Sequence, residues 1–198
     1  MTACVVLAGG AGRRLGGVDK AAVVVGDASM LDRVLAAARP VADSLVVVGP
    51  SRATSVPGVR FVEEDAPGAG PVPAVAAGLD ALAPVTDEDA IVLLAVDQPL
   101  LTTAAVEQLV AGLDADDRPP AVAAAGPDGP NPLLAVYRAG ALRAAVAAIG
   151  PDLAGARAAR LLPAGTVTVD LDAIAATNVN RPADLARARA LVRRAKSR

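Results

Sequence analysis

A glycine-rich and basic segment near the start of the chain has the composition of a phosphate-binding loop. It reads LAGGAGRRLGGVDK from Leu7 to Lys20 and directly follows an apolar stretch. Glycines let backbone N–H groups approach phosphate oxygens closely, because they carry no Cβ. Arg13, Arg14 and Lys20 add the positive charge that a triphosphate requires. These residue types therefore predict a segment that binds a polyphosphate.

The spacing of the glycines excludes two familiar phosphate-binding loops. A Walker loop needs G-x-x-x-x-G-K-[ST], and the segment contains no Gly-Lys pair. A dinucleotide fingerprint needs G-x-G-x-x-G, but a pattern that starts at Gly10 and Gly12 has Leu15 in its third position. The alternative interpretation is a surface turn with incidental charges. A turn, however, needs only one or two glycines and no Asp-Lys pair after them.

A second candidate for chemistry, Asp97, follows the most apolar stretch of the chain, residues 90–96. A carboxylate at the carboxyl end of a strand suits Mg²⁺, because this ion takes few protein carboxylates and completes its shell with water and phosphate oxygens. We therefore expect Asp97 to hold Mg²⁺. The alternative is that Asp97 only caps the turn or helix that follows.

The composition excludes several classes of function. The chain has no histidine and one cysteine, Cys4, which excludes Ser–His and Cys–His hydrolases, thiolate metal clusters and intrachain disulfides. A net charge of −2 and only two aromatic residues, Phe61 and Tyr137, argue against nucleic-acid partners. No stretch is long and apolar enough to span a bilayer, and no signal peptide precedes the first strand. We therefore expect a cytoplasmic protein without membrane contacts.

Predicted strands and helices alternate along the chain. Apolar runs predict strands at residues 3–8, 44–49, 59–64, 90–96, 121–125, 133–137 and 166–170, with a turn at 126–132. Helices are predicted at residues 29–39, 70–83, 103–113, 139–149 and 184–194. Repeated βα units predict one α/β domain over residues 1–198, with three α/β/α layers and a mostly parallel, Rossmann-like sheet. Ligands bind such sheets at the carboxyl ends of the strands, where the glycine-rich segment, Glu64 and Asp97 are expected to converge.

Several motifs together resemble the molybdenum-cofactor guanylyltransferases, within the wider family of sugar-nucleotide-type nucleotidyltransferases. The first segment is similar to their L-A-G-G-x-x-x-R-[ML]-G-x-x-D-K signature, and residues 97–101 to their D-x-P-x-[LI] element. Residues 177–185 resemble the N-[VI]-N-x-P-x-D-L element that closes the family pattern. The resemblance implies a nucleotidyltransferase-type fold. It also implies Mg²⁺-dependent transfer of GMP from GTP to the phosphate of molybdopterin or molybdenum cofactor, with release of pyrophosphate.

The resemblance assigns roles to individual residues. Asp97 would bind the metal, Lys20 and Arg14 would stabilise phosphate charge during catalysis, and Asp19 would orient the loop. The residues implied in nucleotide or acceptor binding are Leu7, Ala8, Gly9, Gly10, Gly12, Lys20, Gly49, Glu64, Asp97, Asn178 and Asn180. The two asparagines could bind the acceptor, and Asn180 could also approach the metal. Alternatively, Asn180 or Asp184 caps the last helix.

The resemblance leaves the base and the acceptor open. A carboxylate at Glu64 could accept the N1–H and N2–H groups of guanine, although residues 63–65 could be a solvated turn. Gln98 is instead typical of cytidylyltransferases that act on the same pterin. The alternatives are therefore a molybdopterin cytidylyltransferase, a guanylyltransferase for another phosphorylated metabolite, or a non-catalytic carrier of the cofactor. Transient contacts with molybdoenzymes or with cofactor-biosynthesis proteins are also expected.

Overall fold

A seven-stranded sheet runs through the centre of the chain in the order β5-β4-β1-β6-β8-β7-β9. The structure, a computed structural model, describes residues 1–9, 18–82, 84–115 and 117–196. The strands of the sheet are β1 (Thr2–Leu7), β4 (Ser44–Val48), β5 (Val59–Val62), β6 (Ala90–Ala95), β7 (Ala121–Gly126), β8 (Gly129–Arg138) and β9 (Val167–Val169). All neighbouring pairs are parallel except those that β8 makes with β6 and β7. The predicted, mostly parallel α/β fold is thereby confirmed.

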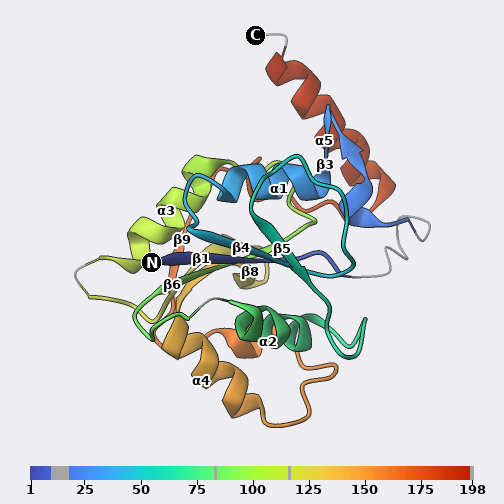
Figure 1. Ribbon diagram of the computed structural model, residues 1–198. Coiled ribbons are helices and arrows are strands. Elements are labelled where there is room, and N and C mark those ends of the chain that lie inside the picture. The colour runs from blue at the N-terminus through green and yellow to red at the C-terminus, as the bar shows by residue number, and fades with distance from the viewer. Residues whose placement is uncertain (10–17, 83, 116, 197–198) are drawn as a thin grey trace.

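Helices cover both faces of this sheet (Figure 1). On one side lie α1 (Met30–Ala38) and α3 (Thr103–Leu113), and on the other lie α2 (Pro71–Ala81) and α4 (Ala139–Ile149). Helix α5 (Pro182–Lys196) projects beyond the layers next to the small hairpin of β2 (Val24–Val25) and β3 (Ala28–Ser29). The described part of the chain also contains the 3₁₀ turns η2 (Lys20–Ala22) and η3 (Ala158–Leu161). Within the described residues, no helix is long and apolar enough to cross a membrane.

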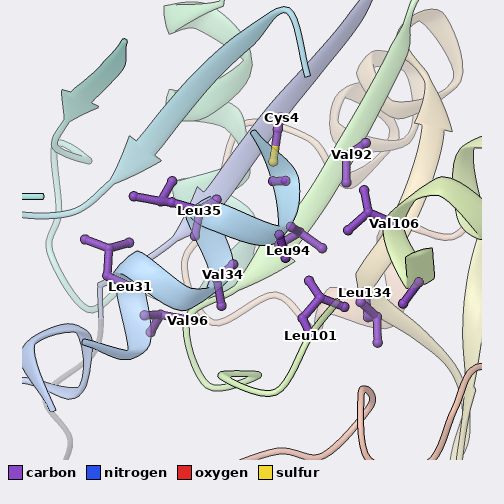
Figure 2. Packing of buried hydrophobic residues seen from close by; sticks show 14 of the residues in the cluster. Cys4, Leu31, Val34, Leu35, Val92, Leu94, Val96, Leu101, Val106 and Leu134 are labelled. Carbon is purple, nitrogen blue, oxygen red and sulfur yellow. The ribbon is translucent and has the colours of Figure 1, made fainter. Parts of the chain in front are cut away.

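The central strands are apolar on both faces because helices bury both of their sides. Along β1, Cys4 faces the cluster under α1 and α3, whereas Val5 faces the cluster under α2 and α4. Figure 2 shows Cys4 among Leu35 and Leu94 in the first of these clusters. Burial raises the pKa of the Cys4 thiol to about 12, so the thiol is protonated at neutral pH and acts as a small apolar side chain.

Helix α2 packs unusually close to β1, and a glycine makes this approach possible. A Cβ on Gly78 would lie 2.5 Å from Cγ1 of Val5 and 3.1 Å from Cγ2 of Val48. Real Cβ atoms essentially never make contacts that close, so a larger residue would push the helix away from the sheet. The position of α2 over the carboxyl half of β1 therefore depends on this glycine.

The turn predicted at residues 126–132 is wrong in its extent. Only residues 127–128 connect β7 to β8, and β8 already begins at Gly129. The three prolines in this stretch suggested a longer loop, because proline cannot donate to a strand ladder. Pro130 is nevertheless tolerated, since β6 pairs with β8 only from Leu134 onward and leaves the first residues of β8 at an edge.

Candidate active site at the carboxyl edge of the sheet

Four predicted site residues follow four neighbouring parallel strands at the same edge of the sheet. They are Gly9 after β1, Gly49 after β4, Glu64 after β5 and Asp97 after β6. Backbone hydrogen bonds continue past the strand ends, as where the N–H of Ala8 donates to the carbonyl of Val48 at 2.9 Å. The strand ends are therefore held in a row, and the predicted convergence on one edge is observed.

Lys20, Asn180 and Asp97 form a polar cluster at this edge. The Nζ of Lys20 donates to Oδ1 of Asn180 at 2.6 Å and lies 3.8 Å from Oδ2 of Asp97. Both charged side chains are largely covered, with 18% of Lys20 and 26% of Asp97 exposed. Lys20 opens the turn η2, for which the Asp19 side chain is the N-cap. The cluster thus combines an ammonium, an amide and a carboxylate that come from three distant parts of the chain.

A backbone contact brings the segment of residues 178–180 to β6. The N–H of Val179 donates to the carbonyl of Asp97 at 2.7 Å. Oδ2 of Asp184 accepts from the N–H of Asn180 at 3.0 Å and from that of Arg181 at 2.8 Å, so Asp184 caps α5. The alternative expectation that Asp184 caps the last helix therefore holds alongside the contact of Asn180 with Lys20. Asn178 lies on the same segment and is exposed.

The electrostatics of Asp97 favour a bound cation. Burial at the end of β6 raises the pKa of its carboxyl above the ordinary value, and Lys20 and a hydrogen bond from Asn180 lower this pKa without cancelling the rise. Within the described residues, no group of three or more acidic, histidine or cysteine side chains converges. Mg²⁺ is compatible with such a site, because this ion takes few protein carboxylates and completes its octahedral shell with water and phosphate oxygens. The donor set present therefore fits this ion.

A cavity of about 600 Å³ adjoins Gly9 at the same edge. Its lining consists of Gly9, Val18, Asp19, Gly49, Pro50, Ser51, Arg52, Glu63, Glu64, Pro67 and Gly68. Oε1 of Glu64 accepts from the N–H of Gly68 at 2.9 Å. Oε2 of Glu64 is buried and has no hydrogen-bond partner within the described residues. A buried carboxylate oxygen without a donor is costly, so a ligand that supplies a donor would be stabilised here.

The backbone that follows the neighbouring strand β1 lies against Gly49 and leaves no room for a side chain there. The φ of Gly49 is +143°, and an added Cβ would lie 3.0 Å from the carbonyl carbon of Ala8 and from the nitrogen of Gly9. L-residues rarely adopt this φ, so a substitution would be strained as well as crowded. The glycine therefore keeps this wall of the cavity free of side-chain atoms.

Other predicted residues are placed differently or lie outside the description. Gly10, Gly12, Arg13 and Arg14 lie outside the described residues. Leu7 and Ala8 are buried beneath the cavity, where the Leu7 carbonyl accepts from Val96 and the Ala8 N–H donates to Val48. Of the three predicted positions 7–9, only Gly9 is among the lining residues of the cavity.

Two further side chains belong to this part of the molecule, Gln98, which the sequence singled out, and Arg52, which it did not. Gln98, the predicted mark of a cytidylyltransferase, is 1% exposed and is not among the lining residues of the cavity. Arg52 was missed, although its Nε and Nη2 donate to the two carboxylate oxygens of Asp19 at 2.6 and 2.9 Å. No motif includes Arg52, and a lone arginine in a loop gives no signal of its own.

A family model and a curated relative point to the same family. A family model described as "MobA-like NTP transferase domain" matches residues 4–167. A molybdenum cofactor guanylyltransferase of Bradyrhizobium sp. strain ORS 278 is 35% identical over 128 residues, which are 61% of this chain and 59% of that protein. The chain thus spans less than two thirds of the length of this curated relative.

Solved structures share the fold across nearly the whole chain. Molybdopterin-guanine dinucleotide biosynthesis protein A from Archaeoglobus fulgidus superposes with a TM-score of 0.71 at 24% identity, covering 98% of this chain and 100% of that one. 2-C-methyl-D-erythritol 4-phosphate cytidylyltransferase from Thermus thermophilus has the same TM-score at 22% identity, with coverage of 98% and 100%. Because the two names state different chemistry, the shared fold does not select a base or an acceptor.

Proposed function

Because the chain belongs to the MobA-like NTP transferase family, we propose that it transfers GMP from GTP to the terminal phosphate of molybdopterin or of the molybdenum cofactor. A phosphate oxygen of the acceptor attacks the α-phosphorus of GTP, the bond between the α-phosphorus and its bridging oxygen breaks, and pyrophosphate leaves. The acceptor phosphate is already ionised at neutral pH, so the reaction needs no general base. This agrees with a chain that contains no histidine.

The observation that carries the proposal is the contact of Lys20 with Asn180 and Asp97 beside the cavity. The 2.6 Å hydrogen bond to Asn180 fixes the ammonium of Lys20 in a largely covered position. A cation held in place before the reaction stabilises developing negative charge without reorganisation. Lys20 would therefore stabilise the pyrophosphate as it leaves, and Arg14, from the same glycine-rich segment, would assist.

Asp97 is the residue that would hold Mg²⁺. Its carboxylate has a raised pKa, which means that Lys20 and Asn180 do not fully compensate its charge. When bound, Mg²⁺ supplies positive charge to the phosphate oxygens. The role of Asp97 is to keep that charge beside Lys20, at the edge of the sheet where both groups can face the same phosphates.

The cavity supports guanine as the base. The volume of the cavity, about 600 Å³, is sufficient for a nucleoside. Glu64 lines the cavity, and its buried Oε2 has no hydrogen-bond donor within the described residues. A carboxylate can accept the N1–H and N2–H groups of guanine together. Cytosine offers no such pair, and Gln98, the residue that favoured CTP, is not among the lining residues of the cavity. GTP is therefore the proposed nucleotide.

The acceptor is proposed from the names of the relatives and not from a contact. The curated relative is named a molybdenum cofactor guanylyltransferase, and one structural neighbour is named for molybdopterin-guanine dinucleotide biosynthesis. We accordingly propose molybdopterin or molybdenum cofactor as the acceptor, with delivery of the product to molybdoenzymes in the cytoplasm. We propose that Asn178, which is exposed and lies two positions before Asn180, contacts this acceptor.

Release of pyrophosphate by the purified protein tests this proposal. The assay contains Mg²⁺ and molybdopterin, and it compares GTP, CTP and ATP, with Asp97→Asn as the inactive control. Release with GTP alone is the expected result. Release with CTP alone would make the protein a cytidylyltransferase. Binding of GTP without release would favour a carrier, and release with another phosphorylated acceptor would change the acceptor but keep the reaction.

A further inference from the structure

An ion pair at the lining of the cavity joins the loop after β1 to the loop after β4. The guanidinium of Arg52 binds both carboxylate oxygens of Asp19, and its Nη1 also donates to the carbonyl of Pro50 at 2.7 Å. Arg52 belongs to the loop after β4, three positions beyond Gly49. Asp19 directly precedes Lys20. The pair therefore connects the part of the cavity proposed to hold the base with the turn that carries the lysine.

The carboxylate of Asp19 has a second task in the same place. Its Oδ1 accepts from the N–H of Ala21 at 3.1 Å and so caps the turn η2, which begins at Lys20. The same Oδ1 accepts from Nη2 of Arg52. A shift of the arginine would therefore move the cap of the turn, and with it the backbone from which the side chain of Lys20 extends.

We propose that Arg52 is a positioning residue that acts through Asp19 to hold Lys20 in register with the nucleotide base. The inference rests on the proposed function. It deepens that function by adding a residue to which no motif assigns a role. Planar, two-bonded pairing fixes both the distance and the orientation of the partners, which a lysine in place of Arg52 could not do.

Solvent reaches the pair from the side of Asp19. Asp19 is 45% exposed and Arg52 is 17% exposed, so solvent screens the attraction between the two charges and limits its contribution to the free energy of unfolding. Small errors in the placement of a catalytic group, by contrast, change rates strongly. We therefore expect loss of Arg52 to affect the use of the nucleotide more than the stability of the fold.

Steady-state kinetics of four variants test the inference. The variants are Arg52→Met, Arg52→Lys, Asp19→Asn and the double variant of Asp19→Asn with Arg52→Met. Asn can still cap the turn, so Asp19→Asn removes mainly the ion pair. We expect Arg52→Met to lower kcat/KM for GTP by about tenfold, with the KM for the acceptor unchanged. Asp19→Asn should match this loss, Arg52→Lys should recover part of it, and the double variant should lose no more than either single one.

Arg143→Met is the matched control. Arg143, on helix α4, forms an ion pair with Asp87 at 2.8 Å, and neither residue is among the lining residues of the cavity. This pair is more exposed than that of Arg52 and Asp19, with 40% of Arg143 and 78% of Asp87 exposed. Loss of Arg143 should leave kcat/KM for GTP unchanged. If Arg52→Met behaves like Arg143→Met, the inference is wrong. If Arg52→Met is impaired and Asp19→Asn is not, Arg52 contacts the nucleotide directly and the positioning role is also wrong.

Hydrogen exchange gives a readout that does not depend on turnover. The N–H groups of Ala22 and Val23 donate to Asp19 and Lys20 carbonyls within the turn. In Arg52→Met these amides should exchange faster than in the unmodified protein, whereas Arg143→Met should leave them unchanged. Unchanged exchange in Arg52→Met would overturn the inference. Absence of pyrophosphate release by the unmodified protein would instead contradict the proposed function, and the exchange experiment would still decide the role of Arg52.

Discussion

The two halves of the candidate site satisfy their polar groups in different ways. In the half with Lys20, Asn180 and Asp97, side chains from distant segments bind one another directly. In the half with Gly49 and Glu64, one wall of a cavity is backbone without a side chain, and a buried carboxylate oxygen has no donor within the described residues. The first arrangement is prepared for charge before a ligand arrives. The second is completed only by a ligand, which suits selection of a base.

The largest effect should follow from removing the carboxylate of the prepared half. Asp97→Asn keeps the shape of the side chain but cannot supply the charge that Mg²⁺ requires. We expect turnover to fall by about 10²–10⁴-fold, the scale on which a single strong electrostatic element acts. Pyrophosphate release at saturating GTP measures this loss. Near-normal turnover would remove Asp97 from the metal site.

Removing the ammonium should have the next largest effect. Lys20→Met keeps much of the apolar stem and deletes the charge beside Asn180. We expect turnover to fall by about 10²–10³-fold, because the leaving pyrophosphate loses a fixed cation. The rate should not recover at high GTP concentration. A loss confined to KM would mean that Lys20 binds substrate and transition state equally.

The open half should respond in affinity and selectivity more than in turnover. Glu64→Gln replaces one acceptor oxygen by an amide that donates, and we expect GTP to bind about 10–100-fold more weakly with little change in kcat. Discrimination between GTP and CTP should shrink with it. Asp65→Asn is the matched control, because Asp65 is exposed and is not among the lining residues of the cavity. Equal effects of both variants would leave no role for Glu64 in reading the base.

The smallest effect is that of Asp97→Asn on stability. We expect this substitution to raise the free energy of unfolding at neutral pH, although it lowers turnover. Burial raises the pKa of Asp97 above its ordinary value of 3.8. At a pH between these two pKa values, the folded state therefore binds more protons than the unfolded state. The free energy of unfolding therefore falls as pH rises through that window. In metal-free buffer, Asp97→Asn should be more stable than the unmodified protein at neutral pH. The difference in the free energy of unfolding should vanish below pH 3.8. Urea unfolding of both proteins at neutral pH and below pH 3.8 measures it.

The sequence was informative where a single local pattern carried the information. Apolar runs identified the strands, and the position of Asp97 after such a run placed it correctly at the carboxyl edge of the sheet. The convergence of the glycine-rich segment, Glu64 and Asp97 followed from the alternation of strands and helices, and Gly9, Glu64 and Asp97 do follow neighbouring parallel strands. The placement of Asp97 needed only the residues beside it, whereas the convergence needed the pattern of the whole chain.

Contacts between distant loops could not be predicted in this way. Arg52 meets Asp19 across 33 positions, and nothing in the spacing of either residue indicates the other. The extent of β8 was also missed, because the tolerance of its prolines depends on which strand lies beside them. The interaction of Lys20 with Asn180 required knowledge of where the segment of residues 178–180 docks on β6.

That interaction also sets the order in which the protein becomes competent. Lys20 and Asn180 are 160 positions apart, and synthesis produces the lysine first. The strands β1, β4 and β6 are therefore synthesised before the segment of residues 178–180 exists. Until this segment has docked, Lys20 and Asp97 lack the amide that holds the ammonium in place. A chain that ends before residue 178 would contain every strand of the sheet and still lack a member of the polar cluster, so we expect it to be unable to act on nucleotide.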